Sequence, residues 1–240
     1  MNEQSVRFRT GMLPMALDGR TLKIIALISM LIDHTGVALF PQLAWMRYVG
    51  RLAFPIYCFL LTEGALHTRD VRKYIFRLLV FAAVSELPFD LALMDGRMFY
   101  MKHQNVFFTL AIGVAMIGVC EYLNRRFSPG KVWMLHVAVF AAAALIAEYA
   151  EVDYHGRGIM VIAAFYFFRN EAVMKYFLVA LVLLYMGGKE PAAILSLILI
   201  DMYNGKRGSQ PTALKYAFYA IYPLHLTILY LIARSGVIGG

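Results

Sequence analysis

Asp33 and His34 are adjacent near the end of the apolar stretch 22–36, LKIIALISMLIDHTG. They follow Lys23 by about ten residues, so an α-helix rising ~1.5 Å per residue would carry both side chains ~15 Å into a membrane whose apolar core is ~30 Å thick. An ionisable side chain at that depth costs at least ~2.5 kcal/mol, and it normally faces the interior of a helix bundle. The pair therefore predicts a functional site inside a membrane protein.

A second histidine is expected at the same depth. His225 follows Lys215 by about ten residues in the last apolar stretch, 216–234, which again gives a depth of ~15 Å. Two imidazoles that titrate near neutral pH can take up and deliver protons, so they predict a reaction chamber to which Tyr222 would add a hydroxyl. The alternative is that the histidines are core residues bonded to backbone carbonyls and that Tyr222 is an ordinary helical aromatic residue.

Charged residues near this chamber would set its electrostatics. Neighbouring residues of a helix point ~100° apart, so Asp33 does not face His34 and is expected to pair with Arg51 of the next apolar stretch. Arg51 would then stabilise an oxyanion or serve only as the partner of Asp33, and a third interpretation is an interfacial anchor. Glu63, in FLLTEGALHT, is either part of the site or a solvated charge at the end of its helix.

The composition indicates that these groups lie in a membrane. The chain has 240 residues, of which 61% are hydrophobic and 16% are charged, and its mean hydropathy is +0.64. Soluble domains are only ~45–50% apolar and ~25% charged. The apolar stretches have the length of helices and do not alternate with polar residues, which excludes a membrane β-barrel. We therefore expect one all-α domain over residues 1–240, a polytopic bundle of transmembrane helices.

Nine apolar segments are expected to form this bundle. They are 22–41, 48–66, 74–93, 105–123, 132–150, 158–168, 175–187, 190–203 and 216–234. The sixth to eighth are shorter than the ~17–25 residues of a full span, so they would be tilted, half-spans or a re-entrant pair. With the N-terminus in the cytoplasm, Lys and Arg favour the inner side by more than two to one, as the positive-inside rule requires. The prediction is a multi-pass protein of a bacterial inner membrane, with residues 1–21 cytoplasmic, residues 22–234 in the bundle and the C-terminus outside.

This topology also explains the basic character of the chain. The net charge of +8 follows from the inner loops, so we expect no nucleic-acid partner. Cys58 and Cys120 both fall within apolar segments and have no metal-binding spacing, so no metal site is expected. Pro55, Pro88 and Pro223 lie within apolar segments, where each removes a backbone donor and would kink its helix beside a cavity.

Two short basic loops, HTRDVRK and YNGKRG, lie on the expected cytoplasmic side. Loops of this kind bind phosphates of an anionic cofactor or of lipid head groups, although they can also serve only to orient a protein in the membrane. The candidate phosphate-binding residues in and after them are Arg72, Lys73, Arg77, Lys206 and Arg207.

Six sequence blocks together resemble the TraX family of membrane proteins. They are LKIIALISMLIDHTG, MRYVGRLAFPIYCFLLTEGALHTRDVRKYIFRLLVFAAVSELPFDLAL, NVFFTLAIGV, DYHGRGIMVI, DMYNGKRG and YPLHL, in order from about residue 20 to residue 230. The family is associated with N-terminal acetylation of conjugative pilin, so the resemblance implies a membrane acyltransferase that uses acetyl-CoA. A weaker similarity extends to multispanning acyltransferases with an intramembrane histidine. The family pattern falls here on Asp33, His34, Arg51, Glu63 and His225.

The resemblance and the residues together predict transfer of acetyl from cytoplasmic acetyl-CoA to an amine or hydroxyl acceptor, such as a protein or peptide N-terminus. His34 would be the general base, with Asp33, Arg51 and His225 beside it. The acetyl-CoA would lie along the basic cytoplasmic face, in contact with Arg77, Arg72, Lys73, Lys206, Arg207, Glu63 and Tyr222. The lipid bilayer is the other expected partner.

Two further functions stay open at this point. The first is a proton-coupled small-molecule transporter, whose relay would consist of Asp33, His34, Glu63, Glu86 and His225. The lack of internal sequence repeats speaks against it. The second is a non-catalytic assembly factor for a pilus or secretion system, which would not need His34 for its function. Thioester cleavage separates the enzyme from both.

Overall fold

The protein is built from helices. The computed structural model describes residues 13–209 and 211–236. Its helices, in chain order, are α1 (Gly19–Ala38), α2 (Ala44–Gly50), α3 (Ala53–His67), α4 (Val71–Leu93), α5 (Val106–Arg126), α6 (Pro129–Tyr149), α7 (His155–Phe167), α8 (Ala172–Met186), the 3₁₀ helix η1 (Glu190–Leu195), α9 (Ser196–Asp201) and α10 (Thr212–Arg234). Within the described residues, β-type pairing is limited to two isolated bridges, Leu17 with Tyr203 and Gln104 with Val152. The all-α prediction is confirmed.

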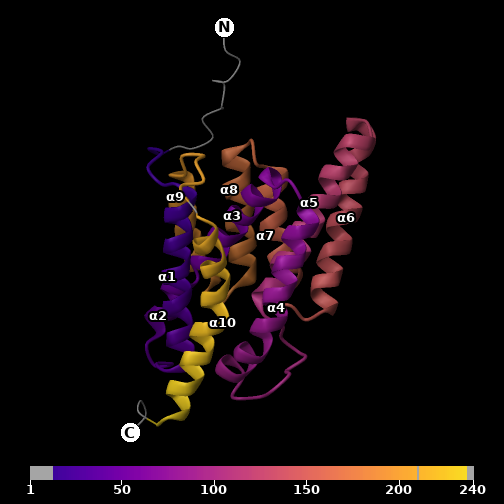
Figure 1. Ribbon diagram of the computed structural model, residues 1–240. Coiled ribbons are helices and arrows are strands. Elements are labelled where there is room, and N and C mark those ends of the chain that lie inside the picture. The colour runs from indigo at the N-terminus through magenta and orange to yellow at the C-terminus, as the bar shows by residue number, and fades with distance from the viewer. Residues whose placement is uncertain (1–12, 210, 237–240) are drawn as a thin grey trace.

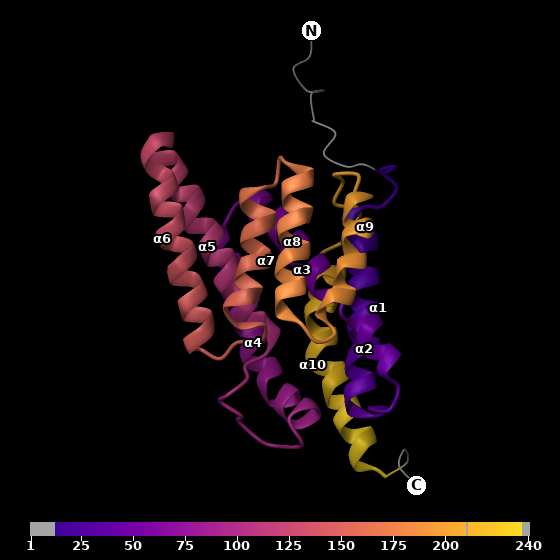
Figure 2. The same ribbon diagram turned by 180° about the vertical axis from the view of Figure 1, so that it is seen from behind.

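The helices lie side by side as a bundle (Figures 1 and 2). Successive passes run in alternating directions, so α1 begins and α10 ends at opposite ends, which we call the Gly19 end and the Arg234 end (Figure 1). Helix α3 packs against α1, α5, α7 and α9, whereas α6 lies at one margin and packs mainly against α5 and α7 (Figure 2).

Helix α3 is central because it is apolar on every side. Its buried residues include Ile56, Cys58 and Leu61, which point in different directions, and a helix that is hydrophobic all round is normally enclosed. Helix α6 is just as apolar, yet among its described side chains only Ala143 and Ala147 are buried. Lipid tails are as apolar as leucine, so the exposed faces of α6 suit a bilayer.

The helix lengths support a membrane protein. Five helical stretches are long and apolar enough to cross a membrane: Gly19–Ala38, Ala44–His67, Val106–Arg126, Gly130–Tyr149 and Tyr216–Arg234. Each of the nine predicted segments coincides with one helix or, for 48–66 and 190–203, with two consecutive helices. The number of crossings, the cytoplasmic N-terminus and the external C-terminus remain predictions.

Pro55 does not kink a continuous helix, contrary to our prediction. The segment 48–66 is interrupted between α2 and α3, and Pro55 lies in the first turn of α3, where its missing N–H has no helical acceptor to lose. The interruption places Arg51 directly after α2, at a junction between two helices. Pro88 and Pro223 do lie inside helices, in α4 and α10.

Side-chain caps fix the starts of three long helices. Asp18 accepts a hydrogen bond from Thr21 N at 2.7 Å, Asp70 accepts one from Lys73 N at 3.1 Å, and Asn105 accepts one from Phe107 N at 3.1 Å. Such caps satisfy backbone donors that have no partner within the helix. The same backbone hydrogen bonds stabilise the charged carboxylates and lower the pKa of Asp18 and of Asp70.

Candidate functional site

His34 of α1 and His225 of α10 are in contact inside the bundle. His34 Nδ1 lies 2.7 Å from His225 Nε2, and the two ring planes are inclined by only 5°. His225 Nδ1 in turn lies 2.8 Å from the carbonyl oxygen of Ile221, one turn earlier in α10. The prediction that the first and last helices bring two histidines to one depth is confirmed, and so is the alternative that one of them binds a backbone carbonyl.

These contacts define which nitrogen of each ring carries a proton. The Ile221 carbonyl can only accept, so His225 Nδ1–H is the donor and, in a neutral ring, His225 Nε2 is left with a lone pair. That lone pair accepts the proton of His34 Nδ1–H. His34 Nε2 therefore keeps its own lone pair and has no hydrogen-bond partner among the described residues. The arrangement is suited to proton uptake at His34, with His225 holding the ring in position.

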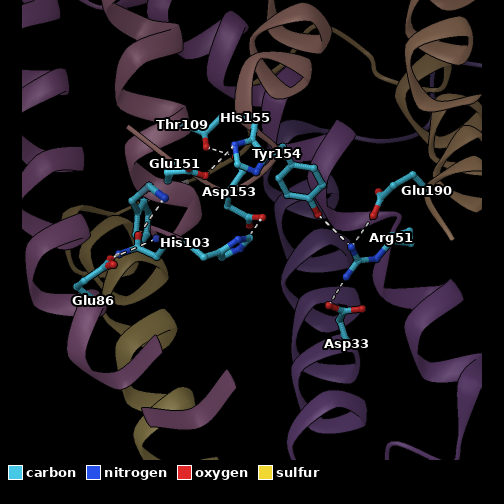
Figure 3. A network of polar contacts seen from close by, with 12 residues as sticks. Asp33, Arg51, Glu86, His103, Thr109, Glu151, Asp153, Tyr154, His155 and Glu190 are labelled. Atoms are coloured by element: carbon cyan, nitrogen blue, oxygen red, sulfur yellow. Dashed lines mark hydrogen bonds and ion pairs between the residues drawn. The ribbon is translucent and has the colours of Figure 1, made fainter. Parts of the chain in front are cut away.

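Asp33 and Arg51 form the centre of a buried ion network (Figure 3). Asp33 Oδ2 accepts hydrogen bonds from Arg51 Nη2 at 2.5 Å and from Arg47 Nη1 at 2.7 Å. Arg51 Nη1 also donates to Glu190 Oε1 at 2.6 Å and to the Tyr154 hydroxyl at 3.4 Å. The predicted Asp33–Arg51 pair is confirmed. Asp33 points to these partners, whereas His34 points to His225, as expected for adjacent helical residues.

Gly50 allows this network to form. A Cβ atom at Gly50 would overlap the side chain of Asp33, so α1 and α2 approach this closely only because residue 50 has no side chain. The approach puts Asp33 directly against the end of α2, from which Arg47 and Arg51 reach it. The GRLAFPIY block thus supplies the glycine and the arginine for one contact.

The ion network and His34 line a cavity of about 540 Å³ at the Arg234 end. Its other walls come from the ends of α4 and α8 and from the loop before α7. Glu151 and Tyr154 of that loop and His155, the first residue of α7, have positive φ angles of 51°, 64° and 47°. Left-handed backbone is unfavourable for residues other than glycine and occurs often at functional sites. Tyr154 is held there by stacking on Phe54, with ring centroids 3.6 Å apart.

A second polar arm lies on the opposite wall of this cavity (Figure 3). His103 Nε2 lies 3.4 Å from Asp153 Oδ1, and the hydrogen bond and charge of that carboxylate raise the pKa of His103. The backbone carbonyl of Asp153 accepts a hydrogen bond from Thr109 Oγ1 of α5. Asn105 binds the Glu86 carboxylate through its side chain and through its backbone N–H, the latter at 3.2 Å. The arm therefore anchors the start of α5 to α4 and to the loop before α7.

A smaller cavity of about 110 Å³ lies on the Gly19 side of the histidine pair. Aliphatic and aromatic side chains line it, together with Lys23, and Tyr222 forms part of its wall. The Tyr222 ring also meets both histidine rings edge-on, with centroids 5.8 Å from His34 and 5.6 Å from His225. Tyr222 therefore stands between the two cavities, next to the chamber that the sequence predicted for it.

The basic residues predicted to bind a cofactor are only partly gathered. Arg77 and Arg207 both interact with Tyr74 and Tyr219, which line the small cavity, and the Arg77 guanidinium lies 5.5 Å from the centroid of the Tyr74 ring. Lys206 is tied to the start of α1, because its carbonyl accepts a hydrogen bond from Gly19 N at 2.9 Å, and Arg207 follows it. Arg72 and Lys73 are exposed on the first turn of α4.

Glu63 lies away from the histidine pair, near Lys175 of α8. Its backbone carbonyl accepts a hydrogen bond from His67 Nδ1 at 2.8 Å. Glu63 lines neither the large nor the small cavity. The structure therefore does not place Glu63 beside Asp33, His34 and His225, with which the family pattern grouped it.

The sequence reasoning missed four residues of the large cavity. Glu190 and Tyr154 were not singled out, whereas the outer-loop residues His103 and Asp153 gave only a weak signal for entry of an acceptor from that side and were not assigned to the site. Tyr154 and Asp153 stand in the DYHGRG block, whose concentration of polar and aromatic residues was a usable signal. Glu190 follows the Gly187–Gly188 turn, and nothing local indicates that this turn returns the chain to Arg51.

Fold and site together define a polytopic helical membrane protein with a histidine pair and an ion network in its interior. The model of one family, described as TraX protein, matches residues 18–233. The chain belongs to the TraX family, which confirms the resemblance seen in the sequence blocks.

Two proteins show what the chain is similar to in sequence. The chain is 31% identical over 232 residues to the probable fimbrial assembly protein FimC, serogroup H1, of Dichelobacter nodosus, covering 87% of this chain and 92% of that protein. A short match, 53% identical over 38 residues, covers 16% of this chain and 15% of an uncharacterised protein of Rickettsia prowazekii (strain Madrid E). No solved structure matches.

Proposed function

We propose that this protein acts from the bacterial inner membrane in the assembly of fimbriae or pili. The similarity to the fimbrial assembly protein of Dichelobacter nodosus, which extends over most of both chains, supports this role. The test is complementation: a strain that lacks that relative is given this chain, and surface fimbriae are counted by electron microscopy. Restored fimbriae support the role. An unrestored strain in which the protein is present in the membrane contradicts it.

The chemistry that the site favours within this role is acetyl transfer from acetyl-CoA to an amine or hydroxyl. The observation that carries this proposal is the free lone pair of His34 Nε2, fixed by the chain from His34 through His225 to the Ile221 carbonyl. As the acceptor attacks the thioester carbonyl, His34 takes its proton, the carbon–sulfur bond breaks, and the proton passes to the departing thiolate of coenzyme A. The products are the acetylated acceptor and free coenzyme A.

The two cavities give each reactant its own approach. The thioester would arrive through the narrow cavity at the Gly19 end, past Lys23 and Arg77, whose charges suit the cofactor's phosphates. The acceptor would enter the wide polar cavity at the Arg234 end, which contains His34. Both Nη atoms of Arg51 are engaged with Asp33, Glu190 and Tyr154, so its role is to hold the charges of that cavity in place.

The deciding experiment is thiol release from acetyl-CoA by the purified protein in detergent, with and without ethanolamine as a small acceptor. We expect turnover by the wild type, loss of it in His34→Gln, and a slower rate at a changed pH optimum in His225→Gln. His136→Gln is the matched control, because His136 lines a separate apolar groove between α6, α7 and α8.

A second function, the non-catalytic assembly factor, is favoured by the relative's name, which refers to assembly and to no reaction. It predicts that His34→Gln still restores fimbriae in the complementation assay. Absence of thiol release from a folded wild-type protein, together with fimbriae restored by His34→Gln, would exclude the enzyme. The transporter is less well supported, because its relay would require Glu63, which lies near Lys175 instead.

A further inference from the structure

The wide cavity at the Arg234 end has more cationic than anionic side chains on its walls. Four permanent cations line it, namely Arg47, Arg51, Arg157 and Lys189, and three carboxylates line it, namely Asp33, Asp153 and Glu190. The three carboxylates do not form ion pairs with all four cations. Two of the carboxylates are shared by two arginines, and the third faces a histidine.

Arg157 and Lys189 take no part in these ion pairs. Asp33 and Glu190 are engaged with Arg47 and Arg51 at 2.5 to 2.7 Å. Among the described residues, neither Arg157 nor Lys189 forms an ion pair with a carboxylate. Lys189 Nζ lies 5.9 Å from the centroid of the Tyr48 ring. A cation–π contact of this length is weak at an exposed site.

The third carboxylate cannot easily supply the missing charge. Asp153 faces His103, whose pKa it raises, so the charge of Asp153 is already engaged with that imidazole. The loop that carries Asp153 is also fixed, since Thr109 Oγ1 donates to the Asp153 carbonyl and Asp153 N donates to Gln104 O at 2.8 Å. Two cations therefore line the cavity with no fixed anion of their own.

We infer that the acceptor bound in this cavity carries an anionic group, a carboxylate or a phosphate, which binds Arg157 and Lys189 while its amine or hydroxyl faces His34. This inference rests on the proposed acetyl transfer and adds the substrate class. Arginine forms paired hydrogen bonds with both kinds of oxyanion, and lysine adds a point charge. A cavity of about 540 Å³ has room for a small molecule or for the end of a larger one.

Three amines of matched size test the inference: ethanolamine, β-alanine and O-phosphoethanolamine. They offer the same primary amine with a neutral, a carboxylate or a phosphate group two carbons away. With wild-type protein and acetyl-CoA, we expect at least one of the two anionic amines to exceed ethanolamine in kcat/KM by roughly tenfold or more. Which of them does so distinguishes a carboxylate from a phosphate substrate.

The variant Arg157→Gln/Lys189→Gln should lower kcat/KM for the preferred anionic amine to near the value that the same variant shows with ethanolamine. Arg234→Gln is the control, because Arg234 lies at the same end of the molecule but outside the cavity lining. Equal rates for all three amines, or a preference that survives the double substitution, would overturn the inference while leaving acetyl transfer intact.

A binding measurement keeps the two proposals separable. If no amine is acetylated, the proposed chemistry fails, and the site is then tested by the rise in melting temperature that each amine produces without acetyl-CoA. A rise with an anionic amine, absent with ethanolamine and lost in the double variant, supports the anion site by itself. No difference among the amines overturns it.

Discussion

The cavity at the Arg234 end, lined by His34, and the cavity at the Gly19 end, lined by Tyr222, share no lining residue and are lined by different kinds of residues. The first, of about 540 Å³, is walled by arginines, carboxylates and histidines. The second, of about 110 Å³, is walled by aliphatic and aromatic side chains, and of the described residues that line it only Lys23 is charged. The polar cavity depends on charges that neutralise one another, whereas the apolar cavity depends on packing alone.

This difference predicts how each cavity responds to substitution. Removing one member of a buried ion network leaves another charge without a partner, which costs more than the loss of a few apolar contacts. The apolar cavity instead has unfilled volume, so it tolerates some added atoms but loses its capacity for a ligand. The predictions below test this contrast, from the largest expected effect to the smallest.

Arg51→Ala should destabilise the protein by about 3–5 kcal/mol, because it leaves the buried carboxylates of Asp33 and Glu190 without their shared partner. The measurement is unfolding in mixed micelles with increasing SDS. Arg47→Ala is the matched control and should have a much smaller effect, since Arg47 is 27% exposed and Asp33 keeps Arg51. Equal effects of the two substitutions would show that the network is not a buried one.

Gly50→Ala should cost about 1–3 kcal/mol, the usual effect of overpacking, because the new methyl group would overlap Asp33 and push α1 from α2. The melting temperature in detergent reports this effect. Gly64→Ala in α3 serves for comparison, because its methyl group would meet only the edge of Tyr74, with the nearest atom at 3.3 Å. A Gly50→Ala protein as stable as the Gly64→Ala protein would refute the close approach.

Val106→Phe should fill the apolar cavity and change stability by no more than about 1 kcal/mol, because free volume is available there. Acetyl-CoA should no longer raise its melting temperature, if that cavity receives the cofactor. Val119→Phe is the control, since Val119 is 45% exposed on the same helix. Retained stabilisation by acetyl-CoA in Val106→Phe would place the cofactor elsewhere.

The weakest effect expected is the pH dependence of the His103–Asp153 pair. The pKa of His103 is raised by Asp153, so the pair stabilises the fold fully below the ordinary histidine pKa and loses its effect as pH rises through the elevated value. Both side chains are partly exposed, which limits the contribution to about 1 kcal/mol or less. Melting curves from pH 5.5 to 8.5, an interval of about three units around neutrality, should show this step in wild type and lack it in His103→Gln. A step of the same size in both proteins would assign it to another group.

Part of this site could be predicted because depth in a membrane follows directly from position along a helix. His34 and His225 each stand about ten residues after a lysine, and this spacing was enough to predict that they lie at one height, whereas their direct contact came only from the structure. Asp33 and Arg51 were paired by the rarity of buried charge. Glu190 and His103 could not be found in this way, because they lie on connecting segments whose course depends on contacts with distant helices.

The sequence by itself determined that this is an all-α membrane protein, which of its segments are helical, and that two histidines lie at one height in the bundle. Only the tertiary structure decided which helices are neighbours, that α3 is central while the equally apolar α6 is marginal, and that Tyr222 of the small cavity contacts His34 of the large one. The reason is physical. Hydropathy and the rise of a helix fix positions along the membrane normal, but lipid is as apolar as a helix face, so lateral arrangement depends on close packing and specific polar contacts.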